Sequence, residues 1–137
     1  MARKILTFIV LLIGAYVGYD QVGSSGQFAD APVVSDASWY GGQQVRGEGT
    51  VTRVLSDDNE GSRHQRFILR LGSGRTVLVA HNIDLAPRIP GIEVGDSVAF
   101  FGEFETNDRG GVIHWTHHDP RGSHPDGWLE HKGQRYE

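Results

Sequence analysis

One short stretch of the sequence concentrates residue types that can do chemistry. Residues 114–128 read HWTHHDPRGSHPDGW and contain four of the chain's seven histidines, with two aspartates and two tryptophans. Imidazole and carboxylate groups bind divalent transition metals, and both also act as general acids and bases. The stretch therefore raises two hypotheses: a metal or catalytic site, or a polar end to a small domain.

The spacing inside this stretch makes it a weak metal motif when taken alone. In an extended strand, His114 and His118 lie about 13 Å apart, so they cannot bind the same ion. His117 and His118 point to opposite faces of such a strand unless Asp119-Pro120 ends it. A metal site here would need ligands from other strands.

Composition bounds the class of protein. The chain has 137 residues, which is room for one domain and a leader, and it has no cysteine. That absence excludes disulfides, thiolate zinc sites, iron–sulfur clusters and cysteine catalysis. Of the 13 basic residues, Arg3 and Lys4 lie in the leader, so 11 basic and 17 acidic residues follow Tyr19, a charge of −6. Such a domain lacks the basic field of a non-specific nucleic-acid binder.

The N-terminus resembles an export or anchor segment. Residues 5–19 carry no charge and follow Arg3 and Lys4. This run predicts an N-terminal hydrophobic anchor helix over residues 1–19, with a cleaved signal peptide as the alternative. The cationic end should stay in the cytoplasm. We therefore expect the membrane as a partner through residues 5–19, and the domain in the periplasm or otherwise outside the cytoplasmic membrane.

Residues 20–44 read as a tether, and residues 45–137 as an all-β domain. The tether is rich in small polar residues and could hold a short helix capped by Asp30. Beyond it, alternating or glycine-interrupted runs predict strands at 45–55, 64–71, 75–81, 97–105 and 111–117. A short C-terminal hairpin at 128–136 should turn at Lys132-Gly133.

This pattern predicts a five-stranded OB-like barrel, the oligonucleotide/oligosaccharide-binding architecture. Three strands in a meander, a non-hairpin connection and two further strands fit it, and a small open β-sandwich is the alternative. The expected core comprises Phe67, Leu69, Val77, Val79, Val98 or Phe101, and Ile113.

Such a barrel would bring distant histidines to one rim. Its third and fifth strands are parallel, so their C-terminal ends meet where the second strand begins. The candidate metal ligands at this rim are His64, His81, His117, His118 and Asp119. Three imidazoles would leave a coordination position open for water or substrate on a divalent metal such as zinc. A polar network without metal is the alternative.

Further residues near this rim are candidates for ligand binding. They are Asp58, Arg63, Arg66, Asn82, Trp115 and Trp128. The arginines could clamp a phosphate or carboxylate, or pair with acids of the 56–63 loop. The tryptophans could stack on a base or sugar ring, although one of them is expected to be core or a lid over the rim. His124 and His131 are expected at the surface.

Several runs carry a resemblance to a known family. They are DDNEGSRHQRFIL, AHNIDLAPRI, GDSVAFFGEFE, GGVIHWTHHDPRGSHPDGWL and HKGQRY. Over about residues 45–137 they resemble the bacterial domain of unknown function numbered 3465, whose members commonly carry an export or anchor segment. The resemblance implies a single exported domain. It implies no catalytic residue, because the activity of that family is uncharacterised.

Three functions remain open at this point. The first is an anchored binding module that holds a nucleic acid, a saccharide or a small anion at the histidine-rich rim. The second is a metal-dependent hydrolase of phosphodiesters, with Asp119 or Asp58 as base and Arg63 or Arg66 stabilising the developing anion. The third is an envelope interaction protein. Binding ranks first because the domain is acidic and matches no catalytic motif.

Overall fold

The structure is a computed structural model that describes residues 35–137. The predicted anchor at 1–19 and the tether up to residue 34, with the helix cap predicted at Asp30, lie outside the described residues. No helix within the described part has the length and hydropathy needed to cross a membrane. One 3-10 turn, η1 (Asp36–Ser38), precedes the strands.

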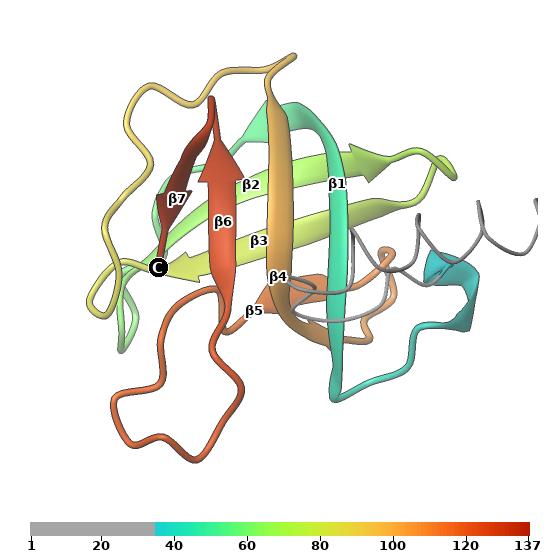
Figure 1. Cartoon of the computed structure of the whole chain (residues 1–137). Helices are drawn as coiled ribbons and strands as arrows, with labels where there is room; N and C mark the ends of the chain where they lie inside the picture. The colour runs from blue at the N-terminus through green and yellow to red at the C-terminus, as the bar shows by residue number, and fades with distance from the viewer. Residues whose placement is uncertain (1–34) are drawn as a thin grey trace, which may run out of the picture. The chain divides into compact units, whose positions relative to one another are not determined.

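Within residues 35–137, seven strands form one sheet that closes on itself (Figure 1). They are β1 (Gln43–Val54), β2 (His64–Leu71), β3 (Thr76–Asn82), β4 (Ser97–Glu105), β5 (Val112–His114), β6 (Trp128–His131) and β7 (Gln134–Tyr136). The order is β1-β2-β3-β5-β4-β6-β7, and a second pairing of β1 with β4 closes a five-stranded barrel. The predicted all-β fold, the parallel pairing of β3 with β5 and the C-terminal hairpin are confirmed.

Glycines allow β1 to pair with β2 and β4 at once. An added Cβ at Gly47 would lie 2.8 Å from the ring of Phe100, and one at Gly49 would lie 2.6 Å from the carbonyl oxygen of Arg70. Only a residue without a side chain fits where the two neighbouring strands approach this closely. The glycine-interrupted run at 45–55 is therefore the strongly coiled strand that closes the barrel.

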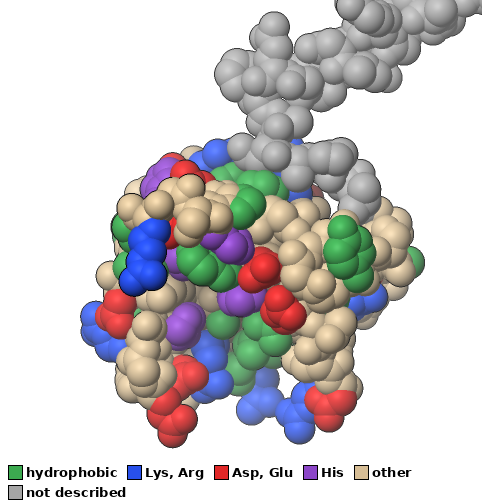
Figure 2. All heavy atoms as spheres, turned by 90° about the horizontal axis from the view of Figure 1, so that it is seen from below, with side chains coloured by type: hydrophobic (Ala, Val, Ile, Leu, Met, Phe, Trp, Pro, Cys, Tyr) green, Lys and Arg blue, Asp and Glu red, His purple; other side chains and the backbone are tan. Residues whose placement is uncertain are grey.

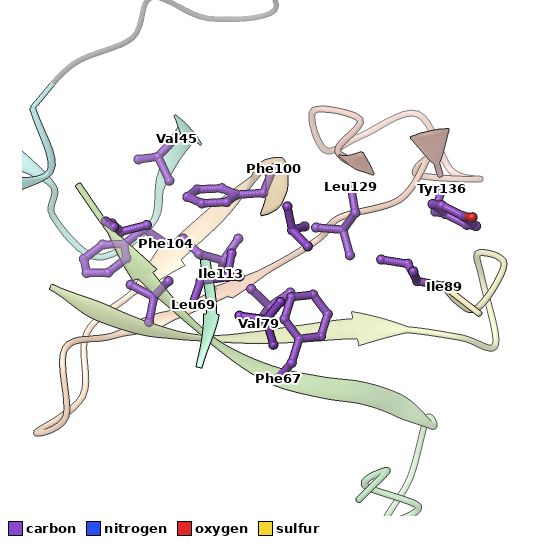
Figure 3. Close-up of a cluster of buried hydrophobic side chains, with 14 of the residues drawn as sticks. Val45, Phe67, Leu69, Val79, Ile89, Phe100, Phe104, Ile113, Leu129 and Tyr136 are labelled. Carbon is purple, nitrogen blue, oxygen red and sulfur yellow. The ribbon is translucent and has the colours of Figure 1, made fainter. Parts of the chain in front are cut away.

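The core fills the barrel as the alternation predicted (Figure 3). All the expected residues are buried, with Val98 rather than Phe101 in the main cluster. Phe100, Phe104 and Leu129 join it, and Trp39, from the predicted tether, packs edge-on to Phe100 with ring centroids 6.1 Å apart.

The fifth strand is shorter than predicted. It ends at His114, and Trp115 takes the left-handed conformation with φ 54°, so the chain leaves the sheet there. The loop 115–127 returns where the N–H of Gly127 donates to the carbonyl oxygen of His117 at 2.9 Å. His117 and His118 thus belong to a loop and not to the end of a strand, which corrects the prediction of a strand over 111–117.

Candidate functional site: the outer face of β2, β3 and β5

His81 is an internal residue of the barrel. It follows Val77 and Val79 on the inward face of β3 and is fully buried. Its Nε2 lies 2.9 Å from the carbonyl oxygen of Pro87, and its Nδ1 lies 2.7 Å from Oγ1 of Thr116. A carbonyl can only accept, so Nε2 donates and Nδ1 accepts the Thr116 hydroxyl hydrogen. Both ring nitrogens are thereby used, and His81 offers no lone pair to a metal.

Burial also controls the protonation of His81. It lowers the pKa of His81 to about 4, with nearby His117, His64 and Arg88 acting in the same direction and the bond to Pro87 opposing them. The ring is therefore neutral at pH 7, as its two hydrogen bonds require.

Asp119 and its neighbours hold the 115–127 loop together. The Asp119 carboxylate accepts from the backbone N–H of Arg121, Ser123 and His124 at 2.7–3.0 Å. These hydrogen bonds lower the pKa of Asp119, and the one from the N–H of Arg121 has the largest effect. The oxygens of the Asp119 carboxylate are therefore used to accept backbone hydrogen bonds within the loop.

His117 and His118 take different structural roles in this loop. The Nδ1 of His117 donates to the carbonyl oxygen of His118 at 2.6 Å. The exposed ring of His118 lies 3.0 Å from Oδ2 of Asp126 and 3.6 Å from Oε1 of Glu137. The bond to Asp126 raises the pKa of His118.

The predicted histidine metal set does not assemble. Within residues 35–137, the one group of three or more side chains whose donor atoms all lie within 4.8 Å of one another is Glu103, Glu105 and His114. The candidates His64, His81, His117, His118 and Asp119 form no such group, because His81 faces the core and the strand ends before His117 and His118.

Glu103, Glu105 and His114, which we call the glutamate–histidine cluster, lie where β4 and β5 pair. Nε2 of His114 is 3.0 Å from Oε2 of Glu103 and 4.0 Å from Oε1 of Glu105. Burial lowers the pKa of His114, although the two carboxylates oppose this. Figure 2 looks at the barrel from the end where the 115–127 loop lies, and histidine side chains gather there beside acidic ones.

His124 was expected at the surface, yet its ring is largely covered. It stacks on the ring of Trp115, with centroids 3.9 Å apart and 12° between planes. Its Nε2 lies 3.6 Å from Oε1 of Glu103, whereas His114 lies beside Oε2 of the same carboxylate. His131, also expected at the surface, is buried, with its Nε2 2.8 Å from Oδ2 of Asp96.

A hollow of about 320 Å³ adjoins the cluster on the outer face of the barrel. We call it the β2–β3–β5 hollow. It is lined by Asp58, His64, Arg66, Leu78, Ala80, Glu105, Val112 and His114. Three of the predicted residues, Asp58, His64 and Arg66, thus meet at one concave surface, and Glu105 and His114 are shared with the cluster.

The other predicted ligand-binding residues are engaged elsewhere. Arg63 pairs with Asp84, Nε to Oδ1 at 2.8 Å, and not with an acid of its own loop. The side chain of Asn82 accepts from the backbone N–H of Asp84. Trp128 is buried between Phe101 and Arg135, and Trp115 lines a different hollow on the 115–127 loop.

The comparisons with known proteins bear on the family of the chain and not on its chemistry. No significant match was found among the curated proteins or among the solved structures. A family model described as "Protein of unknown function (DUF3465)" matches residues 24–137, in agreement with the resemblance seen in the sequence. The chain therefore belongs to the DUF3465 family.

Proposed function

We propose that the domain is a binding module that holds a small anionic molecule in the β2–β3–β5 hollow. The strand order supports an OB-like barrel. The barrel closes in the order β1-β2-β3-β5-β4, with β4 pairing back to β1, and β3 is parallel to β5. OB barrels bind their ligands on the face of their second and third strands, beside the first loop. The hollow occupies that face, and Asp58 belongs to that loop.

The position of Arg66 is the main observation in support of an anionic ligand. Its Nε donates to the carbonyl oxygen of Ser56 at 3.0 Å, which fixes the guanidinium at the wall of the hollow. Among the described residues, Arg63 and Arg88 pair with aspartates, whereas Arg66 makes no ion pair. A fixed guanidinium of this kind suits a carboxylate or phosphate, which it can bind through two parallel hydrogen bonds.

The lining of the hollow favours a small molecule over a nucleic-acid strand. Its apolar lining consists of Leu78, Ala80 and Val112, and no phenylalanine, tyrosine or tryptophan ring lines it for a base to stack on. The net acidic charge of the domain also opposes a polyanion.

The uncharged run at 5–19 supports a membrane-anchored or exported location for this module. Protease added to spheroplasts should then digest the domain while the cytoplasmic proteins stay intact. Protection of the domain would contradict an extracytoplasmic location.

Replacing Arg66 tests the proposed function. Inorganic phosphate, citrate and hexose phosphates would be titrated into the chain and followed by amide chemical shifts. At least one should bind at the β2–β3–β5 hollow, and Arg66→Gln should weaken it by about tenfold or more, since hydrogen bonds to charged groups contribute about 1.5–3 kcal/mol.

The matched control is Arg70→Gln, which removes an arginine from the same strand outside the hollow. It should leave the affinity unchanged. Equal loss in both variants, or no binding of any of these anions, would contradict the proposal, as would binding of single-stranded oligonucleotides alone.

A further inference from the structure

The pairing of β4 with β5 places three potential metal ligands on one surface. Glu103 and Glu105 are two residues apart on β4, so both project from the outer face while Phe104 between them points into the core. In the antiparallel register His114 lies directly opposite Glu103. Residues from two strands thereby converge without any distortion of the sheet.

The separations of the donor atoms suit a metal ion. Ligand atoms bound at about 2.1 Å in tetrahedral geometry lie about 3.4 Å from one another. Nε2 of His114 is 3.0 Å from Oε2 of Glu103 and 4.0 Å from Oε1 of Glu105, and all three donors fall within 4.8 Å of one another. Small side-chain rotations are enough to bring them to one centre.

The polar atoms of the cluster are not satisfied by the protein. Nε2 of His114 is buried and makes no directed hydrogen bond, even though a carboxylate oxygen lies beside it. Among the described residues, neither Glu103 nor Glu105 pairs with an arginine or lysine. Two neighbouring carboxylates and an unused ring nitrogen are stabilised together by a cation.

We propose that Glu103, Glu105 and His114 bind one divalent first-row transition metal ion. An imidazole nitrogen with two carboxylates favours zinc and related ions over magnesium or calcium, which prefer oxygen ligands alone. Because Glu105 and His114 also line the β2–β3–β5 hollow, an open coordination position on the ion would face that hollow. The site does not depend on which molecule the hollow takes.

His124 borders this site without being one of its ligands. Its Nε2 lies 3.6 Å from Oε1 of Glu103, beyond hydrogen-bond distance, and its Nδ1 donates to the carbonyl oxygen of Pro125 at 2.8 Å. Stacking on Trp115 fixes the ring of His124 in turn.

Zinc binding to the full chain, purified without a histidine tag, tests the proposal. Isothermal titration with Zn²⁺ should give one ion per chain, and Mg²⁺ should bind much more weakly. Glu105→Gln and His114→Asn should each weaken Zn²⁺ binding at least tenfold, and His124→Gln should weaken it less. Co²⁺ bound in place of Zn²⁺ should show a visible spectrum that His114→Asn alters.

The control is His118→Asn, which removes an exposed histidine that contacts two other carboxylates. It should bind Zn²⁺ as the unchanged chain does. The proposal is overturned if no stoichiometric zinc binds, if Mg²⁺ binds equally well, or if only His118→Asn reduces binding. Glu105 has a side chain 46% exposed, so Glu105→Gln should fold and decides the test even if His114→Asn does not fold.

Discussion

Gly127→Ala is expected to destabilise the domain by about 3 kcal/mol, the upper end of the usual cost of overpacking. An added Cβ would lie 1.9 Å from the carbonyl oxygen of Trp115 and 2.5 Å from that of Phe101. Both are backbone atoms, so neither can rotate away. The substitution would also pull the N–H of Gly127 from its bond to His117, which closes the 115–127 loop. Urea unfolding followed by tryptophan fluorescence measures the loss.

Gly122→Ala is the matched control in the same loop. Gly122 has φ 65°, but its added Cβ would meet nothing within 4 Å. The cost should therefore be only that of the left-handed conformation, about 1 kcal/mol. An equally small loss in Gly127→Ala would show that the close approach at Gly127 does not hold the loop.

The barrel could be predicted because its strands alternate clearly. Within residues 64–71, Phe67 and Leu69 fall on the same face, and the structure buries both completely. Once three strands form a meander and a longer connection follows, few topologies remain that bury one continuous core. The parallel pairing of β3 with β5, and the hairpin turn at Lys132-Gly133, followed from this reasoning.

The end of β5 could not be predicted from local preference. Val112, Ile113, Trp115 and Thr116 all favour a strand, yet Trp115 adopts φ 54°. Contacts distant in sequence decide this conformation: Trp115 stacks on His124, and Gly127 packs against the Trp115 carbonyl oxygen. The predicted position of His117 and His118 was wrong for that reason.

Two signals for the site were present in the sequence. His81 shares the parity of Val77 and Val79, which were themselves expected in the core, so its inward direction followed from the strand. Glu103-Phe104-Glu105 also has the alternating spacing at which two ligands project from one strand. The spacing of Glu103 and Glu105 does not show which residue lies opposite them, because His114 is set against Glu103 only by the register of β4 with β5.

Acidification from pH 7 to pH 4.5 is expected to lower the free energy of unfolding by about 2–3 kcal/mol through His81 alone. Burial lowers its pKa from 6.5 in an exposed histidine to about 4 in the folded chain. Over this pH range the ring of His81 is therefore protonated in the unfolded chain and neutral in the folded chain. The contribution of His81 to the free energy of unfolding is complete above pH 6.5 and is lost as the pH falls towards 4.

His114, whose pKa burial also lowers, acts in the same direction as His81, and the other shifted groups act outside this window or in the opposite direction. The pKa values of Asp84, Asp96, Asp119 and Asp126 are lowered by their hydrogen bonds, so their contributions are lost only below about pH 4. The raised pKa of His118 stabilises the fold at low pH and less as the pH rises. The variant His118→Asn removes this opposing contribution.

Urea unfolding of His118→Asn at pH 7 and pH 4.5, with and without His81→Gln, isolates the effect of His81. His81→Gln should be destabilised at pH 7, because glutamine cannot repeat both ring hydrogen bonds, but its stability should fall less on acidification. Histidine proton resonances provide the direct measurement, since the ring of His81 should stay neutral to about pH 5 while the chain is folded. A ring that titrates near pH 6.5 would mean that protons reach His81 without unfolding, and that the bonds to Thr116 and Pro87 do not hold it neutral.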